Sequence, residues 1–228
     1  MIYAVRFILL LVLTTFSATL VTSHKADALT QEGAFGSVAI SAPNNAFRAQ
    51  WLGALAEHAD AIFLGDCQTG ELCESPMFKS LSHVFEALAS KSPLEKLQTV
   101  NAAVNHAIIY TTDKNQYGVE DYWALARETL ASGRGDCEDI AILKIWMLRA
   151  AGFAAEALTL VVVKEQARDL HHAVLVVRLG GLNLVLDNLT GAVKPDTQIA
   201  SYQPVVSFST QGSWIHGFRR PVLVARAN

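Results

Sequence analysis

The sequence predicts an α+β fold, with helices in the first half of the chain and antiparallel strands in the second. Apolar residues between positions 46 and 151 recur at the three- and four-residue spacing of helices. After residue 158 the pattern changes to β-branched runs, and two of these flank Gly180-Gly181, a strong signal for a tight hairpin. Helices and antiparallel strands that are segregated along the chain are typical of α+β proteins.

The first 28 residues have the features of a secretory signal peptide. Arg6 provides a short positive start, residues 7–21 are almost purely apolar, and residues 26–28 form an Ala-Asp-Ala cleavage site. A membrane anchor is the alternative, but the apolar run is short for a span of about 20 residues. We therefore expect an exported protein whose mature part, residues 29–228, forms one domain, because domains usually have about 50–250 residues.

The charge of the chain gives no indication of nucleic-acid binding. The formal net charge is −3, and removal of the two basic residues and one acidic residue of the signal peptide makes it −4. No basic run marks a surface for nucleic acid or anionic membranes. We therefore expect no nucleic acid among the partners.

Several segments of the first half are expected to be helical. They are 46–58, 76–89, 92–110 and 138–151, with a shorter helical or mixed piece at 119–130. Ser92 followed by Pro93 and Glu95 is a typical helix start. The segment 138–151 is apolar on most sides and is followed by Gly152, which predicts a central helix closed by a glycine.

The expected strands bring two functional residues together. They are 158–163, 173–177 and 182–186, with further strand-like pieces at 205–208 and 221–224. With a two-residue turn at residues 180 and 181, position 179 faces 182, and His172 and Asp187 then point to the same face as diagonal neighbours. Such neighbours are roughly 7–8 Å apart at the backbone, within side-chain reach. A three-residue loop would favour His171 instead.

The stretch Gly-Asp-Cys-Glu-Asp at residues 135–139 is the most informative part of the chain. Cys137 lies where a helix begins, and the helix dipole lowers the pKa of a thiol there. The neighbouring carboxylates raise the pKa of this thiol instead; they belong to Asp136, Glu138 and Asp139. These carboxylates are either ordinary helix N-terminal residues or ligands of a hard cation such as Ca²⁺, which would offset their charge around the thiol.

The other two cysteines leave Cys137 as the odd thiol. Cys67 and Cys73 are close enough in sequence to close a small disulfide, although two reduced thiols are the alternative. An odd free thiol in an exported protein is a candidate reactive group.

Taken together, these motifs resemble the bacterial transglutaminase-like cysteine proteinases, the LapG type of periplasmic protease. The similarity seen in the sequence covers nearly the whole mature chain and is looser at 119–130 and from 201 onwards. The stretches that carry it are 121–123, 133–141, Lys144, Leu148, Gly152, 172–175 and 184–188.

The resemblance implies a papain-like or transglutaminase-like fold with a Cys-His-Asp triad. Cys137 would be the nucleophile, His172 the base and Asp187 the acid that orients it. Calcium-dependent activity is implied as well, with ligands at the positions of Asp136 and Glu138.

Substrate, inhibitor and compartment are likewise implied only by the resemblance. The substrate would be a large surface adhesin, cut near its N-terminus at an Ala-Ala-type site to release it during biofilm dispersal. An inner-membrane cyclic-di-GMP receptor of the LapD type would sequester the protease in the periplasm. Two other functions stay open: a transglutaminase or amidase using the same triad, and a non-catalytic binding module.

Three further groups are candidates for roles around the site. The backbone N–H of Cys137 is a natural oxyanion donor at a helix start. The indole of Trp123 is a candidate second donor by analogy with transglutaminases, although core packing is the favoured interpretation. His216, in an aromatic and glycine-containing segment, is a candidate for the wall of the cleft.

Overall fold

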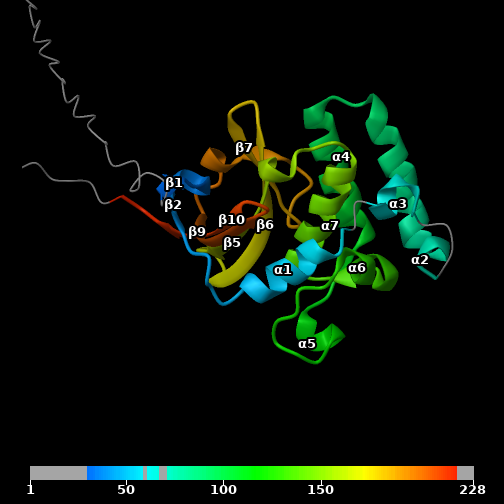
Figure 1. Cartoon of the computed structure of the whole chain (residues 1–228), viewed down its shortest axis with the longest axis horizontal. Helices are drawn as coiled ribbons and strands as arrows, with labels where there is room; N and C mark the ends of the chain where they lie inside the picture. Colours follow the sequence, from blue (N-terminus) through cyan, green and yellow to red (C-terminus); the bar gives the residue numbers. More distant parts are fainter. Residues whose placement is uncertain (1–29, 59–60, 67–70, 220–228) are drawn as a thin grey trace, which may run out of the picture.

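The computed structural model describes residues 30–58, 61–66 and 71–219. Helices lie on one side of a curled antiparallel sheet, to the right of it in Figure 1, and the two layers share one large core. The predicted α+β architecture is confirmed. The predicted signal peptide, residues 1–28, and the strand-like piece at 221–224 lie outside the described residues.

The sheet has eight strands within the described part of the chain, in the order β1-β2-β10-β9-β5-β6-β7-β8, and all neighbouring strands are antiparallel. The bounds are β1 Thr30–Glu32, β2 Val38–Ser41, β5 Leu158–Glu165, β6 Leu170–Leu179, β7 Leu182–Leu186, β8 Lys194–Pro195, β9 Tyr202–Ser209 and β10 Gly212–Gly217. A separate parallel pair joins β3 Ile109–Tyr110 to β4 Arg134–Gly135.

The β6–β7 hairpin has the predicted register. Leu179 pairs with Leu182 and Leu175 with Leu186, so the turn contains two residues. Both turn glycines have positive φ, +59° at Gly180 and +81° at Gly181, as a type I′ turn requires. The two-residue turn is therefore confirmed, and with it the shared face of positions 172 and 187.

The helical layer is built around α7. The helices are α1 Arg48–Ala56, α2 Glu71–Glu74, α3 Pro76–Ala87, α4 Pro93–Ala107, α5 Asp113–Gln116, α6 Ala126–Ser132 and α7 Cys137–Ala150. Short 3₁₀ helices are η2 Ala34–Gly36, η4 Leu88–Ser90, η5 Ala155–Ala157 and η6 Asp196–Gln198, and η3 Ile62–Asp66 is a short π-helix. Residues 138–148 of α7 are all buried, which confirms the predicted central helix.

Two predicted helices differ from the structure. The helix expected to run to residue 110 ends at Ala107, because the next residues pair with β4 instead. The segment 119–130 becomes helical only at Ala126. Before that point carboxylates bind the chain: Asp113 accepts the N–H of Tyr122 at 2.6 Å, and Asp139 accepts that of Ala124 at 2.7 Å.

Strands β1, β2 and β10 were missed from the sequence. Both β1 and β2 are short, and β1 is fully exposed. Pairing holds them at the edge of the sheet: β2 pairs with β10, and β1 pairs with β2.

Both faces of the central strands are buried. Leu160, Leu175 and Leu186 face the helices, whereas Val174 and Val176 belong to a second cluster on the other face. This explains the continuous apolar run of β6, since strands covered on both faces need not alternate. Among the described residues, no helix is long and apolar enough to cross a membrane.

Candidate active site

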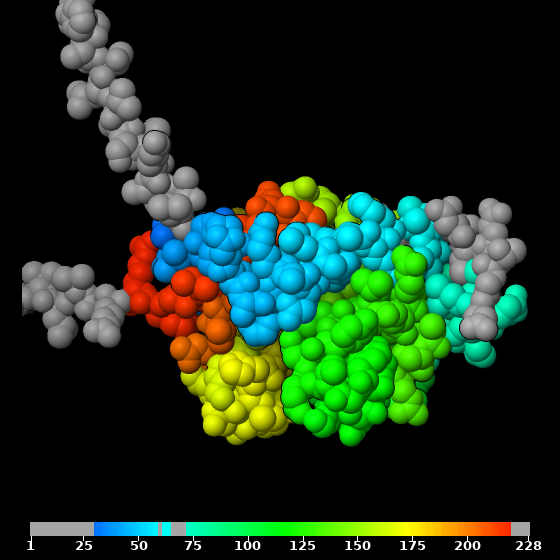
Figure 2. Space-filling view, turned by 60° about the horizontal axis from the view of Figure 1, so that its bottom comes forward, coloured from blue at the N-terminus to red at the C-terminus, as the bar shows by residue number. Residues whose placement is uncertain are grey.

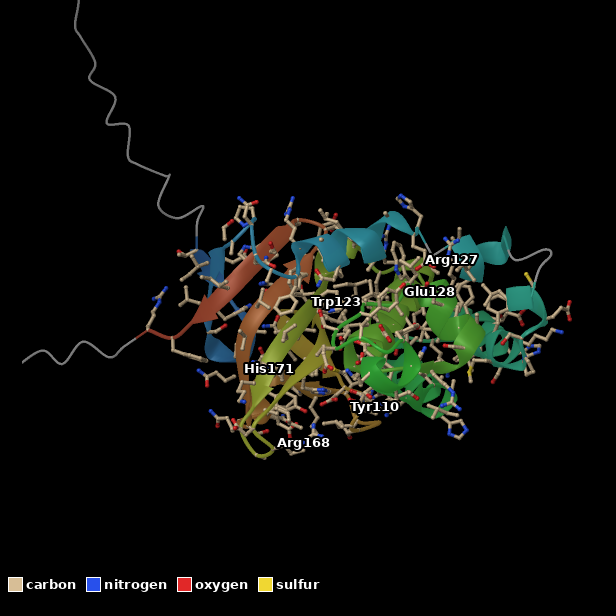
Figure 3. The ribbon with its side chains drawn as sticks, turned by 90° about the horizontal axis from the view of Figure 1, so that it is seen from below. Tyr110, Trp123, Arg127, Glu128, Arg168 and His171 are labelled. Carbon is tan, nitrogen blue, oxygen red and sulfur yellow. The ribbon has the colours of Figure 1, made fainter. Side chains whose placement is uncertain are left out.

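A cleft of ≈ 420 Å³ opens where the start of α7 meets β6. Cys137 and Glu138 line it from α7, His171 and His172 from β6, and Trp123 from the loop before α6. Figure 2 shows the hollow between the yellow, green and light-blue segments, and Figure 3 shows His171 and Trp123 on its two sides. The cleft therefore brings the predicted nucleophile and base to one place.

Cys137 is the first residue of α7 and a free thiol. Its Sγ donates a hydrogen bond to Oε2 of Glu138 at 3.0 Å, and the backbone N–H of Ala173 interacts with the sulfur. Burial and the charges of Glu138 and Asp136 raise the pKa of the thiol well above its usual value. The protein fold alone therefore favours the thiol form, and the carboxylates next to it oppose ionisation.

His172 and Asp187 form a buried pair. Nε2 of His172 lies 2.9 Å from Oδ1 of Asp187, and the two residues are 5% and 4% exposed. The N–H of Leu189 donates to the same carboxylate oxygen at 2.9 Å. With Nε2 engaged in this way, Nδ1 is the ring nitrogen left for a proton from Cys137. His171, by contrast, is exposed.

Tyr202 contacts both members of this pair, and the sequence does not predict it. Its hydroxyl donates to Oδ2 of Asp187 at 2.6 Å, and its ring lies edge-on to His172 with centroids 5.8 Å apart. Burial alone would raise the pKa of Asp187, but the hydrogen bond and charge of His172, together with the bonds from Leu189 and Tyr202, hold it below its ordinary value. No local motif marks Tyr202, because only the pairing of β9 with β5 brings it here.

Replacement of Tyr202 by Phe should weaken this arrangement. Asp187 has a lowered pKa in the folded protein, so it contributes stability that is present above its unfolded pKa of about 3.9 and is lost as the pH falls through the folded pKa. Loss of a hydrogen bond to a charged group costs roughly 1.5–3 kcal/mol. In Tyr202→Phe we expect acid unfolding, followed by circular dichroism, to begin at higher pH, with reduced activity; an unchanged acid midpoint would contradict this role.

Five carboxylates gather beside Cys137. Asp136, Glu138 and Asp139 are the predicted candidates. The structure adds Asp113, at the start of α5, and Asp121, from the loop that follows α5. Ligand atoms of Asp113, Asp121 and Glu138 lie within 4.8 Å of one another, and so do those of Asp113, Asp136 and Asp139.

The electrostatics of this cluster fit a hard cation. Burial first, and then the neighbouring Glu138, raise the pKa of Asp136 to about 9; burial and Asp136 raise that of Asp139 to about 7. Oδ1 of Asp113 and Oδ1 of Asp136 are buried without a hydrogen-bond partner. Oxygen atoms that are buried, unpaired and crowded with other carboxylates are suited to Ca²⁺.

Asp139 has a second role within the cluster. Its Oδ1 accepts the N–H of Ala124 at 2.7 Å, and its Oδ2 accepts that of Asp136 at 3.3 Å. It therefore ties the start of α7 to the preceding loop, as the helix-capping interpretation expects. A role for Asp139 as a metal ligand stays a prediction.

The structure confirms the prediction for Trp123 and contradicts that for His216. Trp123 is 6% exposed and packs against Phe47 and Phe208, with centroids 6.0 and 5.4 Å away, which confirms the favoured interpretation of core packing. The expectation that His216 lines the cleft is wrong. Its ring lies between the hydroxyls of Ser37 and Ser207, at 2.7 and 2.8 Å, in a different pocket. Cys67 lies outside the described residues, so its pairing with Cys73 stays a prediction.

Comparisons with known proteins agree with this geometry. The family model of bacterial transglutaminase-like cysteine proteinases matches residues 71–216, a region that contains the cleft residues Cys137 and His172. No curated protein gave a match.

Solved structures give a similar result. LapG from Legionella pneumophila is 27% identical with a TM-score of 0.58, over 69% of this chain and 85% of that one. Its calcium-bound form gives the same identity and TM-score over 69% and 87% of the two chains. The EGTA-treated form is 25% identical, also with a TM-score of 0.58, over 78% and 90%. The chain therefore belongs to the bacterial transglutaminase-like cysteine proteinases and is a cysteine protease with a LapG-like fold.

Proposed function

We propose that the chain is a calcium-dependent periplasmic endopeptidase that uses Cys137, His172 and Asp187 as a catalytic triad. The observation that carries this proposal is the buried contact of 2.9 Å between His172 and Asp187, beside a free thiol at a helix start. Membership of a proteinase family favours hydrolysis over acyl transfer to an amine.

In this mechanism Nδ1 of His172 takes the proton of Cys137, and Sγ attacks the scissile carbonyl carbon. Asp187 holds the imidazole in the required tautomer and stabilises the imidazolium. The backbone N–H of Cys137, at the start of α7, can donate to the oxyanion. The imidazolium then protonates the leaving amine, and water hydrolyses the thioester with His172 as the base.

The carboxylate cluster supplies the candidate calcium ligands. Asp113, Asp121, Asp136 and Glu138 would hold the ion, and Asp139 would support them. A bound dication would neutralise the negative charge that opposes ionisation of Cys137. The buried unpaired oxygens of Asp113 and Asp136 support this proposal, as does the calcium-bound form of Legionella LapG.

The proposed substrate is the N-terminal region of a large cell-surface adhesin, cut at an Ala-Ala-type site to release the adhesin and promote biofilm dispersal. Apolar walls from Phe47, Trp123 and Val205 line the cleft and suit small apolar residues beside the scissile bond. The predicted signal peptide supports export. A cyclic-di-GMP receptor of the LapD type in the inner membrane would act as the inhibitor.

The function can be tested with purified adhesin fragments. We expect the protein to cut an N-terminal fragment that contains a di-alanine site, and to leave a fragment with arginines at that site intact. The measurement is mass spectrometry of the products, with an added primary amine to reveal any acyl transfer. Amine-linked product in place of the free acid would indicate a transglutaminase instead, and no product from any adhesin fragment would reject the substrate.

Calcium removal is expected to abolish cleavage. EGTA should suppress activity and excess Ca²⁺ should restore it, whereas Mg²⁺ should substitute poorly because it demands a stricter octahedron. Calcium at 100 times its Kd should stabilise the fold by about 2.7 kcal/mol, which a thermal melt detects as a higher Tm.

The double change Asp136→Ala/Glu138→Ala should remove both effects of calcium. Glu74→Ala/Glu86→Ala is a matched control, because these exposed carboxylates lie on other helical segments. Full activity in EGTA, with no calcium binding in calorimetry, would mean that these carboxylates only cap the start of the helix and bind no calcium.

A further inference from the structure

Lys144 is a buried charged residue that the proposed mechanism does not use. It is 1% exposed and lies seven residues after Cys137 in α7, so two helical turns place both residues on the same side of that helix. A buried lysine is costly unless its ammonium group has partners. Its Nζ donates to Oδ1 of Asn101, in α4, at 2.8 Å.

Asn101 also binds the loop that carries Asp187. Its Nδ2 donates to the carbonyl oxygen of Thr190 at 2.9 Å. One turn later in α4, Nδ2 of Asn105 donates to the backbone oxygens of Asp187 and Thr190, at 2.7 and 3.0 Å. The helix α4 therefore binds the 187–190 loop at two points, and Lys144 fixes the first of them to α7. Figure 1 shows α4 beside α7, near the end of β7.

We propose that Lys144, Asn101 and Asn105 are positioning residues, which hold the Asp187 loop in register with the helix that carries Cys137. The proposal rests on the proposed triad. Cys137 and Asp187 come from elements 50 residues apart in sequence, and catalysis requires groups held to within about 0.5 Å. The side chain of Asp187 is fixed by Tyr202, and the network fixes its backbone.

The charge of Lys144 also supports its positioning role. Burial lowers the pKa of Lys144 to about 7, and the charge of Asp187 opposes that shift. An ammonium group near Asp187 favours its carboxylate form, which is the form that orients His172.

The test compares Lys144→Met with Lys96→Met in the calcium-loaded protein. Lys96 is a matched control, because its Nζ also links α4 to α7, through the carbonyl oxygen of Ala151 at 3.0 Å, but at the opposite end of α7 from Cys137. The first readout is the downfield proton resonance of the His172 ring N–H bonded to Asp187. The second is the rate at which iodoacetamide alkylates Cys137.

In Lys144→Met we expect the resonance to shift or broaden and the alkylation rate at neutral pH to fall roughly 3–30-fold. Lys96→Met should match the wild type in both. If Lys144→Met does not fold, Asn105→Ala decides, because this residue is only partly buried and its change removes the bond to the Asp187 backbone.

The outcomes separate the two proposals. If the wild type shows the resonance and His172-dependent alkylation, but Lys144→Met and Asn105→Ala behave like Lys96→Met, the positioning role is rejected and the triad stands. If the wild type lacks the resonance and His172→Ala leaves alkylation unchanged, the triad is rejected, and the positioning role with it.

Discussion

Replacement of Cys137 by Ala is expected to lower the rate of peptide cleavage at least roughly 10⁴-fold, because loss of the nucleophile removes covalent catalysis altogether. The fold should survive. Alanine is smaller than cysteine, remains compatible with the first turn of α7, and removes a thiol that donates a hydrogen bond to Glu138. The measurement is a cleavage assay, with circular dichroism and a thermal melt on the same samples.

Cys73→Ser provides the control for this prediction. Cys73 lies in α2, away from the cleft residues, so the variant should keep measurable activity even if its Tm falls. A Cys137→Ala protein that still cleaves would place the nucleophile elsewhere.

The second large effect is expected at His172. Removal of a general base typically costs 10²–10⁴-fold in rate. In His172→Ala the carboxylate of Asp187 also loses a buried partner at 2.9 Å, so the loss should lie at the upper end of this range or beyond. The measurement is kcat/KM for one peptide substrate across the series of variants.

The neighbouring His171 is the matched control. It lines the same cleft but is exposed, and the hairpin register points its side chain to the opposite face from His172. His171→Ala should therefore lose far less activity than His172→Ala. The reverse order would mean that His171 is the base and that the observed register does not describe the active protein.

The parts of the site that the sequence could predict are encoded locally. An apolar helix that begins at Cys137 and a hairpin closed by two glycines are visible within short windows, and both appear in the structure. The diagonal relation of His172 to Asp187 follows directly from the turn length, since side chains alternate along a strand.

The parts that could not be predicted depend on contacts between distant segments. Tyr202 reaches Asp187 only because β9 pairs with β5. Asp113 and Asp121 join the carboxylate cluster because the segment from α5 to residue 124 is tied to α7 through Asp139. Neither relation leaves a periodic pattern in the sequence.

The most direct test of the proposed triad is a titration of the Cys137 thiol in the calcium-loaded protein. The ultraviolet absorbance of the thiolate is followed against pH, and the difference between the wild type and Cys137→Ala isolates this one group. A thiol paired with an imidazolium has a pKa between about 3.5 and 7.5, against about 8.5 for a free cysteine. We expect the wild type to titrate in that low range and His172→Ala to titrate at or above the free value. A wild-type thiol that titrates at or above about 8.5, unchanged by His172→Ala, would contradict the triad.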